Sequence, residues 1–182
     1  MSAAPSVTIR PARPGDVELI HSLIVALAEY ERAPQAVVGT PSDLGRWLFG
    51  EAPAAEALLA EVNGTTAGFA LFHATFSTWE CQPGLWLEDL FVLPQWRRSG
   101  VGGKLLADLA RITLERGYTR LAWTVLDWNE PALRFYRELG ATVLDEWTNH
   151  RLSGAALAAV AAAAAAGAGA REPPGLGPGG SP

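Results

Sequence analysis

A glycine-rich turn between an apolar strand and an amphipathic helix is the feature that most restricts how this sequence can fold. The run Gln95–Lys104, with sequence QWRRSGVGGK, follows the apolar segment Leu85–Val92. Apolar residues at helical spacing predict a helix from about Gly100 to Arg116, and Gly117 fits the position after its end. Glycines in the first turn of a helix let backbone N–H groups approach an anion, and the helix N-terminus adds favourable partial charge. The run therefore predicts a pyrophosphate-binding turn, with Arg97, Arg98 and Lys104 supplying formal charge.

The residues at positions 98 and 105 decide which of the known phosphate-binding motifs this run can be. A Walker A loop needs Ser or Thr after its Gly-Lys pair, but Leu105 stands there, and the motif's first glycine would fall on Arg98. A Rossmann turn would need a third glycine, again at Leu105. The spacing that fits is Arg-x-x-Gly-x-Gly, at Arg97, Gly100 and Gly102. A glycine-rich helix start that only needs flexibility is the alternative that this run alone leaves open.

The rest of the pattern predicts a mixed α/β domain with helices on the faces of a central sheet. Thr40, Pro41 and Asp43 fit the N-cap, N1 and N3 positions of a short helix, and Asn63–Gly64 fits a tight hairpin turn. Helices are expected at about Val17–Leu27, Pro41–Phe49, Gly100–Arg116 and Pro131–Leu139. Strands are expected at Val7–Arg10, Ala57–Val62, Ala67–Phe76, Leu85–Val92, Leu121–Leu126, Thr142–Thr148 and His150–Ser153.

The composition changes near the C-terminus. We expect the folded domain to cover residues 1–153 and an Ala-rich helix, capped by Ser153, to cover residues 154–166. Residues 167–182 contain six Gly and four Pro, which bury too little apolar surface to offset the entropy of ordering. We therefore expect that last segment to be a disordered tail.

Charge and cysteine content exclude several classes of function. The net charge is −5 and no segment pools Lys and Arg, which argues against nucleic acid or an anionic membrane as a partner. The single cysteine, Cys81, rules out an intrachain disulfide and fits a reducing compartment. Met1–Pro14 lacks the apolar core of a secretory signal, so we expect a cytoplasmic location. His21, His73 and His150 are far apart in the sequence, and no metal site is expected.

Two adjacent acids interrupt the apolar strand before the glycine-rich turn. Glu88 and Asp89 lie inside the sequence LEDLFV, and burying a carboxylate without a partner is costly. Adjacent strand residues point to opposite faces, so both can face one cleft only if the strand bulges. The alternative is that one of them lies at an exposed strand end.

A second motif completes a family resemblance. Asn129-x-x-Ala132, followed by Phe-Tyr-x-x-x-Gly-Ala at Phe135–Ala141, resembles the second acetyl-CoA motif of GNAT acetyltransferases. More narrowly, Leu87–Val92, Trp96–Gly102 and Trp128–Pro131 resemble the diamine acetyltransferases, the spermidine/spermine and thialysine N-acetyltransferase group. The resemblance runs from about residue 7 to 152. It implies the GNAT fold, with a mostly antiparallel mixed sheet flanked by helices. It also implies acetyl-CoA as co-substrate, a small-molecule amine as acceptor, and a homodimer.

The resemblance also implies residue roles. Glu88 would accept the proton of the amine through water, and Tyr136 would protonate the departing thiolate; the bland alternative for Tyr136 is a core tyrosine on the face of Leu133 and Leu139. Residues expected at acetyl-CoA are Leu90, Phe91, Val92, Arg97, Arg98, Ser99, Gly100, Val101, Gly102, Gly103, Asn129, Pro131 and Tyr136. Residues expected at the amine are Tyr30, Glu31, Trp79, Glu88 and Asp89.

The identity of the amine stays open at this stage. Pro34, Gln35 and Ser77 stand where the spermidine enzymes carry acids, which weakens a long polycation and favours a shorter amine such as a thialysine-like amino acid. Two other functions compete with this one. The chain could be a protein or peptide N-acetyltransferase, or an acetyl-CoA-binding module without catalytic activity.

Overall fold

A five-stranded sheet with helices on both faces forms the first of two units in the computed structural model, which describes residues 6–165. The first unit is Met1–Asn129 and the second is Glu130–Pro182. The strands are β1 (Val7–Pro11), β2 (Glu56–Val62), β3 (Thr65–Ser77), β4 (Gln82–Val92) and β5 (Leu121–Trp123). The helices are α1 (Val17–Tyr30), α2 (Pro41–Phe49), α3 (Val101–Glu115), α4 (Glu130–Glu138) and α5 (Gly154–Ala165). Three short 3₁₀ turns cover Pro14–Asp16, Pro34–Ala36 and Pro94–Trp96.

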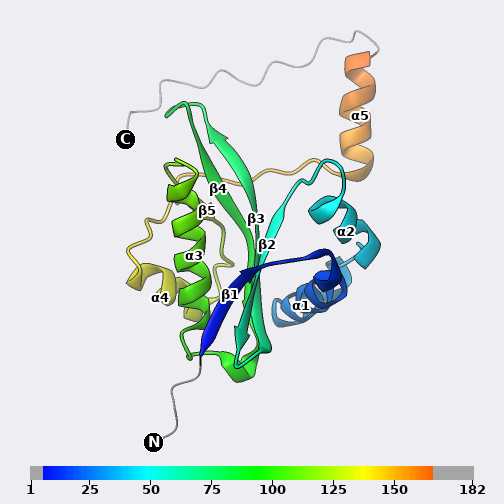
Figure 1. The fold of residues 1–182 in the computed structure, drawn as a ribbon. Coiled ribbons are helices and arrows are strands. Elements are labelled where there is room, and N and C mark those ends of the chain that lie inside the picture. Colours follow the sequence, from blue (N-terminus) through cyan, green and yellow to red (C-terminus); the bar gives the residue numbers. More distant parts are fainter. Residues whose placement is uncertain (1–5, 166–182) are drawn as a thin grey trace, which may run out of the picture. The chain divides into compact units, whose positions relative to one another are not determined.

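The sheet has the order β1-β2-β3-β4-β5. The first four strands are antiparallel neighbours, and β5 runs parallel to β4. This mixed, mostly antiparallel arrangement confirms the predicted fold class. The parallel pair follows from the connection between the two strands, because α3 returns the chain across one face of the sheet before β5 begins (Figure 1).

Local signals that were read from the sequence form as expected. Asn63 and Gly64 have φ values of 50° and 78°, the left-handed conformation that the tight β2–β3 turn requires. Thr40 caps α2: its hydroxyl accepts a hydrogen bond from the Asp43 backbone N–H, and the Asp43 carboxylate accepts one from the Thr40 backbone N–H. Gly117, with φ 71°, ends α3.

Different helices cover the two faces of the sheet in the first unit (Figure 1). On one face, Ile20, Leu23 and Leu27 of α1 pack with Phe69 and Phe91 of the sheet in one buried cluster. On the other face, the buried stripe of α3 packs against β1, β3 and β4. Full burial of such a side chain contributes about 1.5–3 kcal/mol, so each helix is held to the sheet mainly by its apolar stripe. These two surfaces of the sheet are called the α1 face and the α3 face below.

Two strand predictions were wrong. β5 ends at Trp123 and not at Leu126, because β4 departs from regular pairing beyond Leu87, the last residue that pairs with β5. The predicted strands Thr142–Thr148 and His150–Ser153 do not form. Their large apolar side chains are exposed: Val143, Leu144, Trp147 and Leu152. A strand is stabilised by a ladder and a buried face, and this segment buries none of its large apolar groups.

The second unit contains α4 and α5. Gly140, with φ 82°, follows the end of α4 as predicted, and α5 begins at Gly154 directly after Ser153. The predicted tail, residues 167–182, lies outside the described residues. Across residues 6–165, every helix is too short or too polar for a bilayer crossing.

Candidate active site

A β-bulge in β4 is the local feature around which the predicted site is built. Leu87 pairs with Phe72 and Asp89 pairs with Leu71, so Glu88 is an extra residue on β4 without an opposite partner on β3. A bulge of this kind breaks the alternation of side chains between the two faces. Before the bulge Leu87 lies on the face of Phe72, and after it Asp89 lies on the face of Leu71.

Both acids project on the α1 face. Asp89 is opposite Leu71, which packs against the cluster that contains α1. Glu88 accepts a hydrogen bond from the indole N–H of Trp86, with 3.0 Å between Nε1 and Oε2. Trp86 pairs with His73, which is two residues from Leu71 along β3 and so shares its face. Both acids of an adjacent pair can face one side of a strand only where the strand bulges, and β4 bulges at this point.

Three carboxylates gather where α1 ends against β4. Burial, together with the smaller effect of the nearby carboxylates of Glu88 and Glu31, raises the pKa of Asp89 to about 6. Burial also raises the pKa of Glu31, which directly follows α1. Glu88 differs from the other two, because its side chain is 56% exposed. Burial raises the pKa of a carboxylate, as a general base requires, and in this structure the more buried acid is Asp89 and not Glu88.

The pairing between β4 and β5 ends just before the bulge. β5 pairs with β4 only from Leu85 to Leu87, and within the described residues the ladder between them does not continue past that point. The backbone of Leu90–Val92 therefore lies along an edge that β5 does not occupy. A backbone edge of this kind offers N–H groups to a carbonyl oxygen, as the sequence analysis expected at Phe91 and Val92.

The glycine-rich turn has the geometry of an anion site. Arg98 and Gly100 have φ values of 61° and 83°, and a turn with such left-handed residues curls its N–H groups toward one point. Gly100 is the N-cap of α3 and provides no side-chain cap, so the first N–H groups of a 15-residue helix stay open to an anion. Ser99 is turned back, its hydroxyl donating to the Trp96 carbonyl at 2.5 Å. Lys104 is directed elsewhere and donates to the Val7 carbonyl at 3.1 Å.

Arg97 joins the turn to the end of α1. Its Nε donates to the carbonyl of Val92 at 3.1 Å, and its guanidinium lies 4.4 Å from the ring centroid of Tyr30. The same group lies 5.7 Å from the ring of Phe91. The Tyr30 hydroxyl donates in turn to Oδ1 of Asn129 at 3.1 Å. Residues predicted for the two substrates are thus brought together through one cation–π stack.

Three predicted residues lie outside this group. Trp79 is in the exposed turn between β3 and β4, and the strand from Gln82 to Glu88 alone spans roughly 20 Å at the usual rise per residue. Pro131 and Tyr136 belong to α4 in the second unit. Burial raises the pKa of Tyr136, which keeps its hydroxyl protonated at neutral pH.

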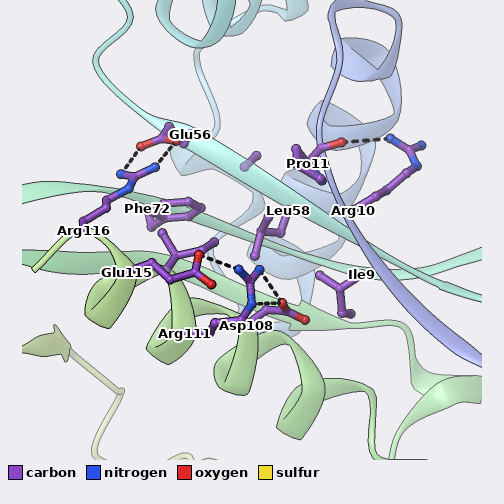
Figure 2. A pocket seen from close by; sticks show the side chains of 12 residues that line it. Ile9, Arg10, Pro11, Glu56, Leu58, Phe72, Asp108, Arg111, Glu115 and Arg116 are labelled. Carbon is purple, nitrogen blue, oxygen red and sulfur yellow. Dashed lines mark hydrogen bonds and ion pairs between the residues drawn. The ribbon is translucent and has the colours of Figure 1, made fainter.

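The α3 face carries a separate pocket of about 330 Å³ (Figure 2). Leu58 and Phe72 line its floor, and none of the predicted site residues lines it. Figure 2 shows two ion-pair sets at its rim. Arg111 binds Asp108 and Glu115, and Arg116 binds Glu56.

Comparison with known proteins identifies the family. Residues 24–141, which include the bulge, the turn and α4, match the profile of the acetyltransferase (GNAT) family. The chain belongs to the GNAT acetyltransferase family. Enzymes of this family use acetyl-CoA as co-substrate. The predicted enzyme class and the resemblance read from the sequence are confirmed.

Relatives named as N-acetyltransferases match more than four-fifths of the chain. Thialysine N-epsilon-acetyltransferase of Bos taurus is 35% identical over 162 residues, which are 83% of this chain and 95% of the relative. L-ornithine N5-acetyltransferase of Arabidopsis thaliana is 30% identical, over 84% of this chain and 86% of the relative.

Solved structures share the fold. An integron cassette protein from the mobile metagenome of V. cholerae superimposes with a TM-score of 0.72 and 26% identity, over 86% of this chain and 98% of that one. An aminoglycoside acetyltransferase from a soil metagenome superimposes with a TM-score of 0.68 at 18% identity, over 81% and 95% of the two chains. The second likeness concerns the fold alone.

Sequence reasoning missed two residues that lie beside Glu88 in this candidate site. His73 and Trp86 face each other across β3 and β4, and both contact Glu88. Counting back from the Ser77–Gln82 pair that closes the hairpin would have placed them opposite one another.

Proposed function

We propose that this GNAT enzyme transfers the acetyl group of acetyl-CoA to a primary amine of a small molecule: a diamine, a polyamine or a thialysine-like amino acid. The observation that carries the proposal is the acidic cluster of Glu31, Glu88 and Asp89 beside the open edge of β4. An ammonium group is the ligand that such a cluster attracts, because it relieves the repulsion between carboxylates that adds to burial in raising the pKa of Asp89.

The residues of the turn fit the diphosphate of acetyl-CoA, which supplies the activated acetyl group. The uncapped N-terminus of α3 and the left-handed residues Arg98 and Gly100 would bind the anion. Backbone N–H groups of Leu90–Val92 would polarise the acetyl carbonyl. Asn129 is fixed by Tyr30 and would orient the pantetheine arm. We retain the other predicted contacts, including Ser99, Val101, Gly102, Gly103 and Pro131, as parts of this proposal.

The amine must lose a proton before it attacks, because a free alkylammonium has a pKa near 10. We propose that the Glu88–Asp89 pair removes it. Glu88 is accessible to water, and Asp89 has a pKa of about 6, close to the value that suits a base at neutral pH. Tyr136 would hold its proton at Oη until it donates it to the departing sulfur.

Two observations support a short amine over a long polycation. The two relatives described above are named for thialysine and ornithine, amino acids that carry a single side-chain amine. Ser77, where the spermidine enzymes carry an acid, is buried at the end of β3, and its hydroxyl accepts from the backbone N–H of Glu80. Tyr30 and Glu31 at the end of α1 would bind the remainder of the amine, with Trp79 as a further predicted contact.

The test follows thiol release from acetyl-CoA with thialysine, ornithine, lysine, putrescine, spermidine and short peptides. We expect turnover with at least one small amine, reduced tenfold or more by Tyr136→Phe. Tyr118→Phe is the matched control, because it removes the same hydroxyl from a tyrosine outside the site. Turnover only with peptides would favour a protein N-acetyltransferase, and acetyl-CoA binding without turnover would favour a silent binding module.

We also propose that the enzyme is a cytoplasmic homodimer whose folded domain covers residues 1–153. The support is the relationship to the diamine acetyltransferases read from the motifs. Light scattering coupled to size exclusion measures the mass of the particle. A mass of one chain at micromolar concentration would contradict the dimer.

A further inference from the structure

We propose that His73 accepts the proton that leaves the amine, as the last member of a relay that runs from Asp89 through Glu88 to solvent. This inference rests on the proposed acetyl transfer and assigns a catalytic step to a side chain outside the sequence motifs. The observation behind it is the position of one imidazole on the α1 face, directly beside the bulge.

The hydrogen bonds of His73 fix which nitrogen can take a proton. Nδ1 lies 3.0 Å from the carbonyl oxygen of Ala74. A carbonyl oxygen can only accept, so Nδ1 carries the hydrogen and the neutral ring keeps its lone pair on Nε2. Nε2 faces Oε2 of Glu88 at 3.8 Å. That distance is bridged by one water molecule or by a small rotation of either side chain.

Trp86 holds Glu88 in place for this exchange. Its indole N–H donates to the same oxygen, Oε2, at 3.0 Å. An indole can donate but cannot accept, so Trp86 orients the carboxylate without taking its proton. Oε1 of Glu88 makes no hydrogen bond among the described residues and remains open to water or to the amine.

The side chains of Asp89, Glu88 and His73 differ in their exposure to solvent. Asp89 is half-buried, whereas the side chains of Glu88 and His73 are 56% and 39% exposed. The other titratable group that faces the cluster is Glu31 at the end of α1, and Arg97 lies over the ring of Phe91 further along β4. A proton placed on Asp89 or Glu88 is thus surrounded by carboxylates on one side and meets an imidazole on the other.

The proton balance closes without another reagent. The N–H bond of the ammonium breaks and its proton goes to a carboxylate oxygen of Asp89 or Glu88, which leaves a neutral amine. The carboxylate passes the proton to Nε2 of His73, and the imidazolium then donates from Nδ1 to Ala74 and from Nε2 toward Glu88. Release of the Nε2 proton to water restores the starting state. Imidazole exchanges protons near neutral pH, which suits this last step.

The test compares His73→Gln with the wild type in kcat/KM measured from pH 5.5 to 9, with acetyl-CoA and the amine that turns over fastest. We expect kcat/KM of the variant to fall at least tenfold at neutral pH and its pH profile to change on the acidic side. Addition of free imidazole should restore part of the lost activity. His21→Gln is the matched control, because His21 lies on α1 and its Nε2 forms a hydrogen bond with the Gly39 carbonyl. His73→Asn provides a second variant, and the melting temperature of each shows whether it is folded.

The outcomes separate the two proposals. A wild type that acetylates an amine, with a His73→Gln variant of unchanged pH profile and no response to imidazole, would overturn the relay and leave the proposed function standing. A wild type that acetylates no amine would overturn both. If His73→Gln loses activity that free imidazole restores, and His21→Gln keeps its activity, the result supports proton transfer by His73 over a structural role.

Discussion

Two groups of acids, one on each face of the sheet, differ in how they are paired. On the α3 face, Asp108 and Glu115 flank Arg111, and Glu56 binds Arg116. On the α1 face, Glu31, Glu88 and Asp89 lie together, and nothing in residues 6–165 donates a charged hydrogen bond to Asp89. Paired charges at a rim are a structural arrangement, whereas a half-buried acid beside two others is costly and is kept where chemistry needs it. The comparison therefore supports our proposal that catalysis takes place on the α1 face, and it is consistent with a stabilising role for the charges of the α3 face.

The largest expected difference is between two glutamates, Glu88 on the α1 face and Glu115 on the α3 face. Glu88→Gln removes a carboxylate that we propose takes part in proton transfer, and we expect kcat/KM to fall by about 100-fold, within the range for a general base. Glu115→Gln removes the same charge from an exposed pair with Arg111 and should leave kcat/KM within twofold. Steady-state kinetics on both variants checks this, and equal losses would break the distinction between the faces.

The next effect concerns Arg97, which lies between the turn and the end of α1. Arg97→Gln removes its stack on Tyr30 and its charge near the turn, so we expect KM for acetyl-CoA to rise by about tenfold, or ~1.4 kcal/mol. Arg111→Gln is the control on the α3 face. Isothermal titration with CoA measures the affinity directly, and unchanged affinity in Arg97→Gln would remove that residue from the cofactor site.

Stability and activity should change in opposite directions when Asp89 on the α1 face is replaced. Because the pKa of Asp89 is raised to about 6, the folded protein pays for an ionised carboxylate above that pH. Asp89→Asn should therefore stabilise the fold at pH 7.5 by at most about 3 kcal/mol, while it lowers activity. As pH falls from 6 to below 4, the gain should vanish, because the wild-type carboxyl becomes protonated in both the folded and the unfolded state.

Asp108→Asn is the matched change on the α3 face. It breaks an ion pair and should destabilise slightly at pH 7.5, by less than about 1 kcal/mol. Thermal unfolding of both variants across pH 3.5–8 makes the measurement. A destabilised Asp89→Asn at neutral pH would mean that the Asp89 carboxylate has a favourable partner.

The smallest effect is expected at the pocket of the α3 face. Arg116→Ala removes the pair with Glu56 and a contact with the ring of Phe72, whose centroid is 6.0 Å from the guanidinium. We expect a loss of stability of about 1 kcal/mol and no change in kcat/KM. A marked kinetic defect in this variant would show that the pocket contributes to the reaction.

Local rules were enough to predict the motif-bearing part of this enzyme. The glycine positions around Gly100 and the cap at Thr40 depend on neighbouring residues only, so the sequence contains the information. The adjacency of Glu88 and Asp89 even indicated the need for a bulge. Which of the two acids is buried was not predictable, because it depends on where α1 packs across the sheet.

The remaining misses also come from tertiary structure. Residues 142–153 contain apolar and β-branched residues that favour strands, but intrinsic preference does not supply a partner strand. The contact of His73 with Glu88 depends on the register of a long hairpin and on one extra residue in β4. The register follows only when the Ser77–Gln82 pair that closes the hairpin is known, and the sequence did not identify that pair.

The most direct test of the central claim is mass-spectrometric detection of the acetylated amine after incubation of the wild type and Glu88→Gln with acetyl-CoA and thialysine or ornithine. The account predicts a product 42 Da heavier than the amine, the mass of one added acetyl group less one hydrogen, and about 100-fold slower formation in the variant. Equal rates in the two proteins, or acetyl-CoA binding with no acetylated amine, would contradict it.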